Sequence, residues 1–375
     1  MRDSLLGRDF RSIVVFKQRH IGDVLLSTPA FRALRVAYPS ARITAVVNEG
    51  TEPMLTGNPD IDRIVIFGRS LKEEGGLARI KEEVSFLREV RSLRPALAVQ
   101  LTEGDRGAIH SVLSGARYRL GVAPGKAGIF GKERLFTHLC PRPDRYRHAV
   151  QRDLDILAAA GIPPAEPSLR FFCSGQDRDM LAGKMSRAGV PGGTHYAVIH
   201  PTSRWKFKCW TDEGMAGIIS YLSRKGIHPV LTSGPDPVEV DQADRIAELS
   251  GATCASLAGS LTLKELGAAI ASARIFVGVD SAPMHIAAAA GTPVVALFGP
   301  TGAYNWAPWE GVDWGYTAES PAGTRRVGRH IVVQKEWDSI QKGKEEGKRN
   351  SGMEEITLEE VVLAIDLVLS PESGP

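Results

Sequence analysis

Short apolar runs alternate along the chain with longer segments in which apolar residues recur every three or four positions. The short runs are typical of buried strands, and the longer segments are typical of amphipathic helices. In the first half this pattern predicts strands at residues 13–16, 43–47, 64–67 and 96–101, and helices at 28–37, 77–93 and about 149–160. Prolines at 163, 164 and 167 then mark a boundary, and a short strand is expected near 169–172.

The alternation continues in the second half. It predicts strands at 195–200, 228–232, 274–278 and 294–298, and helices at 211–225, 237–249, 263–272 and 357–369. Thr357 followed three residues later by Glu360 is a capping box for the last helix. Residues 311–352 are expected to be irregular, with the charged tract at 342–349 as a mobile loop. The pattern predicts an α/β protein of two doubly wound parallel-sheet domains, at 1–172 and 173–353.

Composition agrees with a two-domain soluble protein. A chain of 375 residues exceeds the usual size of one domain, and 43% hydrophobic with 24% charged residues is ordinary for a globular protein. The four cysteines form no C-x-x-C pair, so neither a disulfide framework nor a zinc site is indicated, and a reducing cytoplasm is expected. We expect no secretory signal or membrane span, because no apolar stretch approaches roughly 18 residues.

Charge is distributed unevenly. Residues 1–170 hold 27 Lys and Arg against 19 Asp and Glu, whereas the remainder holds 19 against 24. This excess could be a solvated surface or a landing site for a polyanion such as anionic lipid or a phosphorylated saccharide. Nucleic acid ranks last because no aromatic-studded basic motif is present. The excess is concentrated in a set that we call the basic cluster: Arg117, Arg119, Lys126, Lys132, Arg134, Arg142, Arg145, Arg147 and Arg152.

Two junctions between a strand and a helix carry the candidate chemistry. Residues 278–285 follow an apolar strand and open a helix, with Ser281 as a suitable N-cap and Pro283 near the first helical position. The free N–H groups of such a turn form a site for phosphate. The other junction brings Asp23 to the carboxyl end of the first strand. One junction in each half indicates a two-lobed enzyme with its cleft between the lobes.

The loop at 201–210 is basic and rich in hydroxyl groups, and it follows the first strand of the second half. Loops at this position bind ligands in α/β sheets, and Lys208 is placed to contact a diphosphate. In isolation Lys206 and Lys208 would be read as solvated and Trp210 as core. Beside a second phosphate-binding turn, we favour ligand binding. There is no G-x-G-x-x-G, G-x-S-x-G or H-E-x-x-H motif, and the segment 121–127 is too short between its glycines for a P-loop.

The segments 22–29, 208–210 and 278–285 together resemble the ADP-heptose:lipopolysaccharide heptosyltransferases of glycosyltransferase family 9. Within the family, the segments 201–210, 231–236 and 278–283 are most similar to the heptosyltransferase III subgroup, which adds a side-branch heptose to the inner core. The resemblance implies a GT-B fold with an N-terminal acceptor domain and a C-terminal nucleotide-sugar domain. It also implies that the last helix, at 354–370, packs back on the first domain.

The resemblance implies roles for individual residues. Asp23 matches the catalytic base and Lys208 the phosphate-binding lysine of an inverting transfer. Asp280 either holds its turn or binds a donor-sugar hydroxyl, and His285 either touches donor phosphate or packs within the turn. No metal is required in principle, because a lysine and a helix N-terminus supply the positive charge. The remaining donor-binding candidates are Thr202, Ser203, Asp236, Glu239, Ser281, Ala282, Pro283 and Met284.

The resemblance also implies partners. The donor would be ADP-heptose, and the acceptor would be inner-core lipopolysaccharide on lipid A, bound by Arg142, Arg145 and Arg147. Such an enzyme is expected in the cytoplasm, in transient contact with the cytoplasmic face of the inner membrane. Two alternatives stay open: a GT-B glycosyltransferase with another nucleotide sugar or acceptor, and a non-catalytic nucleotide-binding homologue.

Overall fold

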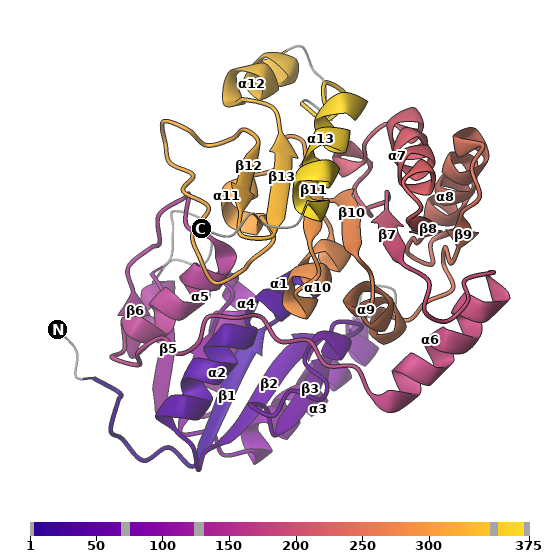
Figure 1. Ribbon diagram of the computed structural model, residues 1–375. Helices are drawn as coiled ribbons and strands as arrows, with labels where there is room; N and C mark the ends of the chain where they lie inside the picture. The colour runs from indigo at the N-terminus through magenta and orange to yellow at the C-terminus, as the bar shows by residue number, and fades with distance from the viewer. Residues whose placement is uncertain (1–3, 69–75, 124–130, 346–351, 371–375) are drawn as a thin grey trace. The chain divides into compact units, whose positions relative to one another are not determined.

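The computed structural model describes residues 4–68, 76–123, 131–345 and 352–370. Contacts between residues divide the chain into two compact units, Met1–Phe172 (unit 1) and Cys173–Pro375 (unit 2). Each unit has its own sheet with helices around it (Figure 1). The two sheets confirm the α/β class that the alternating apolar pattern predicts.

Unit 1 contains a sheet of parallel strands in the order β3-β2-β1-β4-β5-β6. The chain runs outward from β1 to β3 and then returns to the other side of β1 with β4, so the strand order reverses between β1 and β4. In open α/β sheets this switch point is where ligands bind, at the carboxyl ends of the strands. The strands are β1 (Ser12–Lys17), β2 (Arg42–Asn48), β3 (Arg63–Phe67), β4 (Leu97–Gln100), β5 (Tyr118–Val122) and β6 (His138–Cys140).

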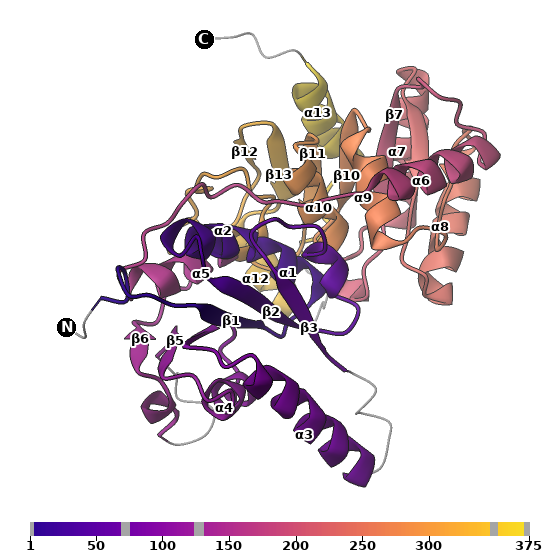
Figure 2. The ribbon, with the colours of Figure 1, turned by 90° about the horizontal axis from the view of Figure 1, so that it is seen from below.

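Helices cover both faces of this sheet, with α2 and α5 on one face and α3 and α4 on the other (Figure 2). Apolar side chains of β1, β2 and β3 pack with Phe86 and Val90 of α3 to form one core. The helices are α1 (Ile21–Leu26), α2 (Thr28–Ala37), α3 (Gly76–Ser92), α4 (Asp105–Leu113) and α5 (Ala149–Ala158), with short 3₁₀ helices η1 (Glu52–Met54) and η3 (Lys132–Leu135).

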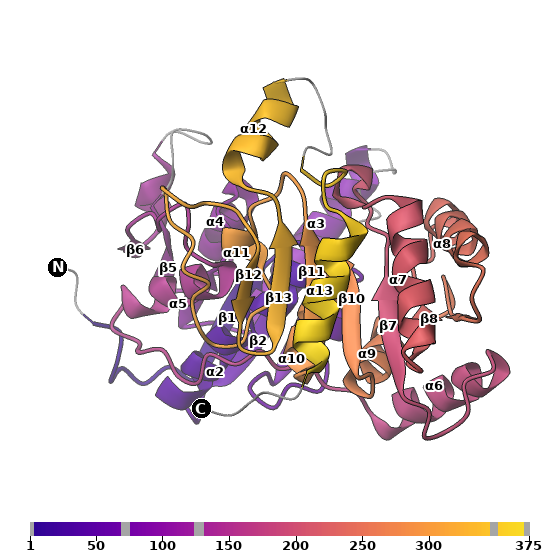
Figure 3. The same cartoon turned by 45° about the horizontal axis from the view of Figure 1, so that its top comes forward.

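Unit 2 contains a sheet in the order β12-β13-β11-β10-β7-β8-β9 (Figure 3). Only β12 runs antiparallel to its neighbour, and the strand order reverses between β7 and β10. The strands are β7 (Tyr196–His200), β8 (His228–Leu231), β9 (Ala255–Ser256), β10 (Ile275–Val279), β11 (Val294–Phe298), β12 (Arg325–Val327) and β13 (His330–Gln334). The helices are α6 (Gly175–Arg187), η4 (Lys206–Lys208), α7 (Asp212–Arg224), α8 (Pro237–Ser250), α9 (Leu263–Ala271), α10 (Ala282–Ala290), α11 (Ala303–Trp306), α12 (Trp337–Glu345) and α13 (Leu358–Leu369).

The last helix packs within unit 2, where α13 contacts α7, β11 and β13. Its buried residues Val361, Ala364 and Ile365 join the core of that unit, because they form one apolar stripe along the helix. That residues 354–370 also pack on the first domain stays a prediction. The predicted capping box is present, with the N–H of Glu360 donating to Thr357 Oγ1 and the N–H of Thr357 donating to Glu360 Oε2.

The segment 311–352 is not irregular throughout, as the sequence analysis expected. It contains β12, β13 and α12, and β13 pairs in parallel with β11 along its whole length. The signal was weak because only three consecutive apolar residues, at 331–333, mark the buried strand. Part of the charged tract at 342–349 lies in α12, and residues 346–349 lie outside the described residues.

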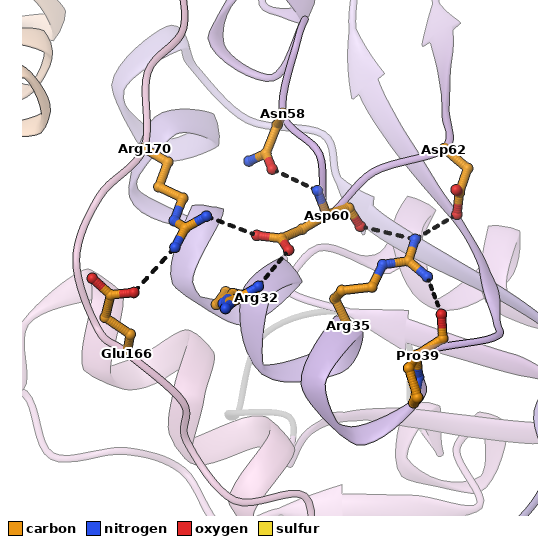
Figure 4. A network of polar contacts seen from close by, with 8 residues as sticks. All are labelled: Arg32, Arg35, Pro39, Asn58, Asp60, Asp62, Glu166 and Arg170. Carbon is orange, nitrogen blue, oxygen red and sulfur yellow. Dashed lines mark hydrogen bonds and ion pairs between the residues drawn. The ribbon is translucent and has the colours of Figure 1, made fainter.

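The strand expected near 169–172 is absent from the described chain, which is extended but unpaired with the sheet there. Side chains hold this segment in place of a strand ladder. The backbone N–H of Arg170 donates to Thr28 Oγ1, and its guanidinium approaches the buried carboxylate of Asp60, which Arg32 also contacts. Figure 4 shows Asp60 between the two arginines. Leu169, Phe171 and Phe172 suggested a strand here, but only Leu169 is buried and the segment does not pair with the sheet.

Candidate functional site

A partly buried ion pair lies at the switch point of unit 2. Lys208 ends η4 in the loop after β7, and its Nζ lies 2.7 Å from Oδ2 of Asp280, which follows β10. The lysine side chain is 19% exposed and the aspartate 5%. The structure thus brings together two residues that the sequence analysis singled out 72 positions apart. A cation at this edge of a parallel sheet is suited to binding an anionic ligand.

Glycine is required where β10 passes β7. A Cβ atom on Gly278 would lie 2.7 Å from the carbonyl oxygen of His200, its register partner on β7. His200 is itself buried, and burial lowers the pKa of its imidazole to about 4. Its Nδ1 lies 3.0 Å from Thr232 Oγ1 at the end of β8. This neutral histidine, which the sequence analysis did not single out, belongs to the packing beneath the candidate site.

The turn at 281–285 has the predicted strand-to-helix form. Ser281 is the N-cap residue of α10 and Pro283 lies in its first turn, but the serine Oγ donates to the carbonyl of Val279 (3.2 Å) and does not cap the helix. The N–H of Met284 donates to the carbonyl of Ser281, and proline has no N–H. Met284 and His285 are buried. The turn therefore offers fewer backbone donors than its sequence suggests.

A second polar cluster ties the loop after β7 to the loop after β8. Glu239 Oε2 accepts from Oγ1 of the buried Thr202 (2.7 Å) and from the N–H of Gly234 (3.2 Å). Asp236, by contrast, is the exposed N-cap of α8 and accepts from the N–H of Val238. The two acidic candidates thus differ, because one is built into the site and the other caps a helix.

The other hydroxyl candidate, Ser203, accepts from the N–H of Trp205 (3.3 Å) within the same loop. Lys206 lies in this loop as well and lines a shallow hollow of about 290 Å³ with Trp210, Gln242 and Arg245. Trp210 is buried and its indole N–H donates to the carbonyl of Ile356. Of the two lysines in the loop, only Lys208 contacts the turn after β10.

Asp23 lies near the switch point of unit 1. It is in α1, the short helix that follows β1, and its side chain is 11% exposed. Oδ2 accepts from the N–H of His20 (3.3 Å), and Oδ1 lies 3.7 Å from Nε of Arg19. The helix was not predicted, since α1 spans only six residues. These contacts hold a carboxylate at the carboxyl end of β1 that is still accessible to solvent.

A buried ion pair that the sequence analysis missed lies at the end of β1, before α1 begins. Nζ of Lys17, the last residue of β1, contacts both carboxylate oxygens of Asp153 on α5 (2.9 and 2.6 Å) and the carbonyl of Leu101 (3.3 Å). Both side chains are 6% exposed. Burial raises the pKa of Asp153 to about 6; Lys17 opposes this rise and the negative charge of Asp23 adds to it.

The basic cluster is only partly available to a ligand. Arg147 forms a bidentate pair with Asp155 (2.8 and 2.9 Å), whereas Arg142 is exposed and Arg145 lies over the ring of Tyr146. Within the cluster, Arg119 donates to the carbonyls of Leu135 and Ala116, and the buried Lys132 pairs with Asp105. Lys126 lies outside the described residues. Much of the charge excess is therefore engaged within unit 1.

Two features concern metals and membranes. The described residues contain no group of three or more His, Cys, Asp or Glu side chains arranged to hold a metal ion. Among the described helices, none has the length and apolar character needed to cross a bilayer.

Comparison with known proteins decides the family. The model of glycosyltransferase family 9 (heptosyltransferase) matches residues 95–326. The chain is also 35% identical over 294 residues to lipopolysaccharide heptosyltransferase 3 of Escherichia coli (strain K12), covering 78% of this chain and 83% of that protein. The chain belongs to glycosyltransferase family 9.

Solved structures agree with this family in fold. A family 9 glycosyltransferase from Veillonella parvula matches with a TM-score of 0.78 at 24% identity, covering 96% of this chain and 97% of that one. The E. coli heptosyltransferase WaaC with ADP matches with a TM-score of 0.72 at 18% identity, covering 95% and 99%. The two doubly wound units are thus those of a GT-B glycosyltransferase, as the resemblance implied.

Proposed function

We propose that this family 9 glycosyltransferase transfers L-glycero-D-manno-heptose from ADP-heptose to the inner core of lipopolysaccharide, with inversion at the anomeric carbon. The observation that supports this proposal most directly is the Lys208–Asp280 pair, which puts a cation at the switch point of unit 2. The similarity to lipopolysaccharide heptosyltransferase 3 supports the heptose donor and the side-branch subtype.

We assign the donor diphosphate to Lys208. An ammonium group has three N–H donors, and Asp280 accepts from one of them, so two can donate to phosphate oxygens. The N–H groups of Ser281 and Ala282, at the start of α10, add neutral donors with the favourable direction of the helix dipole. Together they compensate the charge that develops on the departing ADP, and the proposed reaction needs no metal for this purpose.

The remaining donor contacts follow from the second polar cluster. We assign the ribose hydroxyls to Glu239 rather than to Asp236, because Thr202 and Gly234 orient its carboxylate while Asp236 is used as a cap. Asp280 holds Lys208 in place, which favours a positioning role for it over a direct contact with the sugar. His285 is assigned to packing beneath the turn because it is buried.

We assign the general base to Asp23. Its carboxylate takes the proton of the acceptor hydroxyl as the hydroxyl oxygen attacks the anomeric carbon. The bond between that carbon and the diphosphate oxygen breaks on the opposite face, so configuration inverts and ADP leaves. A carboxylate held by His20 and Arg19, yet open to solvent, is suited to this role.

We assign the phosphorylated acceptor to the exposed part of the basic cluster, Arg142 and Arg145. Inner-core lipopolysaccharide is rich in phosphate and acidic sugars, so cations on unit 1 would attract it. Because this acceptor is carried on lipid A, we place the enzyme in the cytoplasm, in transient contact with the cytoplasmic face of the inner membrane.

The test is a transfer assay with purified protein, ADP-heptose and a phosphorylated inner-core acceptor. We expect the acceptor to gain the mass of one heptose while one equivalent of ADP is released. ADP-glucose and UDP-sugars serve as donor controls. Transfer from one of these instead of ADP-heptose would identify a different donor, and ADP binding without any transfer would identify a non-catalytic homologue.

A further inference from the structure

The buried pair of Lys17 and Asp153 is costly and belongs to no part of the proposed reaction. Removing two charges from water has a large penalty, which is offset only if their geometry is good and their other hydrogen bonds are made. Here all three N–H groups of Lys17 have acceptors: both oxygens of Asp153 and the carbonyl of Leu101. The pair therefore joins three elements, the ends of β1 and β4 and the inner face of α5.

This junction adjoins the short helix that carries the candidate base. Lys17 is separated from α1 by only three residues, and α1 packs against α5, which carries Asp153. The negative charge of Asp23 is close enough to act on Asp153. Near the switch point of unit 1, the lysine–aspartate pair is 6% exposed, and Asp23, which also lies 3.7 Å from Arg19, is 11% exposed.

We propose that Lys17 and Asp153 are positioning residues for Asp23, and that their opposite charges must balance for Asp23 to act as the base. This inference rests on the proposed function of Asp23. It assigns no contact with substrate to either residue. Their role is to fix the end of β1 that leads into α1 and to present a net neutral pair to the carboxylate.

Neighbouring charged groups on the elements around α5 are engaged elsewhere, apart from Arg152. Arg152 of α5 itself acts on Asp153 in the same direction as Lys17. Arg32 and Arg35 of α2 are held by Asp60 and Asp62. The other titratable groups on these elements, with their partners, are Arg119 (Leu135 and Ala116 carbonyls), Tyr118 (Arg8), His138 (Thr137) and Cys140 (Pro141 and Asp155 carbonyls).

Charge balance predicts opposite effects for the two single variants. In Asp153→Asn the uncompensated Lys17 cation stabilises the anion of Asp23, so the acid limb of the kcat–pH profile should move to lower pH by on the order of half a unit or more. The plateau kcat should also fall, because a more stable anion is a weaker base. In Lys17→Met the limb should move to higher pH, because the charge left on Asp153 is negative.

The double variant Lys17→Met with Asp153→Asn removes both charges. Its acid limb should return to within about 0.2 units of the wild type, since the pair then adds no net charge and Arg19 beside Asp23 is unchanged. A purely structural role would not give opposite shifts that cancel. The matched control is Glu265→Gln, which breaks the pair of Lys184 and Glu265 in unit 2 and should leave the limb unmoved.

Two further measurements keep the test decisive. ADP affinity, measured by calorimetry, should be unchanged in every variant, which shows that unit 2 is intact. If the single variants do not fold, Asp153→Glu keeps the charge but displaces the carboxylate, and it should lower kcat several-fold with little change in the limb or in the donor KM.

The variant Asp23→Asn distinguishes failure of the base assignment from failure of the positioning role of Lys17 and Asp153. Near-normal turnover in that variant overturns both the base assignment and this inference. If Asp23→Asn is inactive, but Asp153→Asn and Lys17→Met leave the limb unmoved or shift it the same way, the base assignment stands and the inference is overturned.

Discussion

The two sheets of this protein place a lysine–aspartate pair at the same topological position and use it differently. In unit 1, Lys17 and Asp153 meet between the ends of β1 and β4, and in unit 2, Lys208 and Asp280 meet between the ends of β7 and β10. The ammonium group of Lys17 donates to three protein oxygens, whereas among the described residues that of Lys208 donates to one carboxylate oxygen, of Asp280.

The difference distinguishes a lysine that supports the protein structure from a lysine that can bind a ligand. A lysine whose donors are all used inside the protein cannot bind a ligand without breaking buried contacts, which is strongly unfavourable. A lysine held at one point by a carboxylate keeps its direction and still has two donors to offer. At the same edge of the same kind of sheet, the lysine of unit 1 is therefore used in internal contacts near a candidate base, whereas the lysine of unit 2 keeps donors for a ligand.

The largest expected effect is at the base. Asp23→Asn should keep ADP binding but lose roughly two to four orders of magnitude in kcat, the usual contribution of a positioned base. Single-turnover measurements with ADP-heptose and acceptor would check this, with ADP affinity as the control for folding. Turnover close to the wild type would mean that another group removes the proton.

The next effect concerns the cation of unit 2. Lys208→Ala should weaken ADP binding by about 1.5–3 kcal/mol, because it removes a charge-assisted contact to phosphate, and kcat should fall as well. Lys206→Ala is the matched control in the same loop and should change ADP affinity far less, because it does not contact the turn after β10. Calorimetric titration with ADP compares the two, and equal losses would refute the assignment to Lys208.

A smaller change in ADP affinity, in the opposite direction, is expected for a substitution of Asp280. Asp280→Asn removes a negative charge beside the proposed diphosphate site, so ADP binding should tighten by roughly threefold to tenfold. The kcat should fall, because Lys208 loses the partner that directs it. Weaker ADP binding in this variant would show that holding Lys208 matters more than the repulsion between carboxylate and phosphate.

The smallest effect is expected at the acceptor surface. Replacing Arg142 and Arg145 together with Gln should raise the acceptor KM by roughly twofold to fivefold at low salt, because it removes cations that attract the phosphorylated acceptor. The effect is small because exposed charges are screened within ~8 Å at physiological salt, and ADP affinity should stay unchanged. Arg147→Gln is the control, since Asp155 already neutralises this arginine.

Ionic strength sharpens that test. The difference in KM should shrink as salt is added, and it should be larger for a phosphorylated acceptor than for its dephosphorylated form. Identical KM values for the double variant and the wild type on both acceptors at low salt would remove the acceptor role of this surface.

Local patterns predicted most of the fold. The strands at 43–47 and 294–298 and the helices at 28–37 and 237–249 match β2, β11, α2 and α8 to within about one residue, because each has a clear period and recognisable ends. The errors fall where the signal is short or ambiguous. The strand β13 shows only three consecutive apolar residues. The segment 169–172 has three apolar residues, but the contacts of Arg170 hold it in place of strand pairing.

The sequence by itself determined the fold class, the candidate base and the two loops of the candidate donor site, because these follow from periodicity and from motifs within a few residues. Only the tertiary structure decided which charges meet. It paired Lys208 with Asp280, enclosed Lys17 with Asp153, and neutralised Arg147 with Asp155. The first two of these contacts join residues 72 and 136 positions apart. Contacts at such separations depend on the order of strands in the sheet and on which helix covers them, and no local pattern records either.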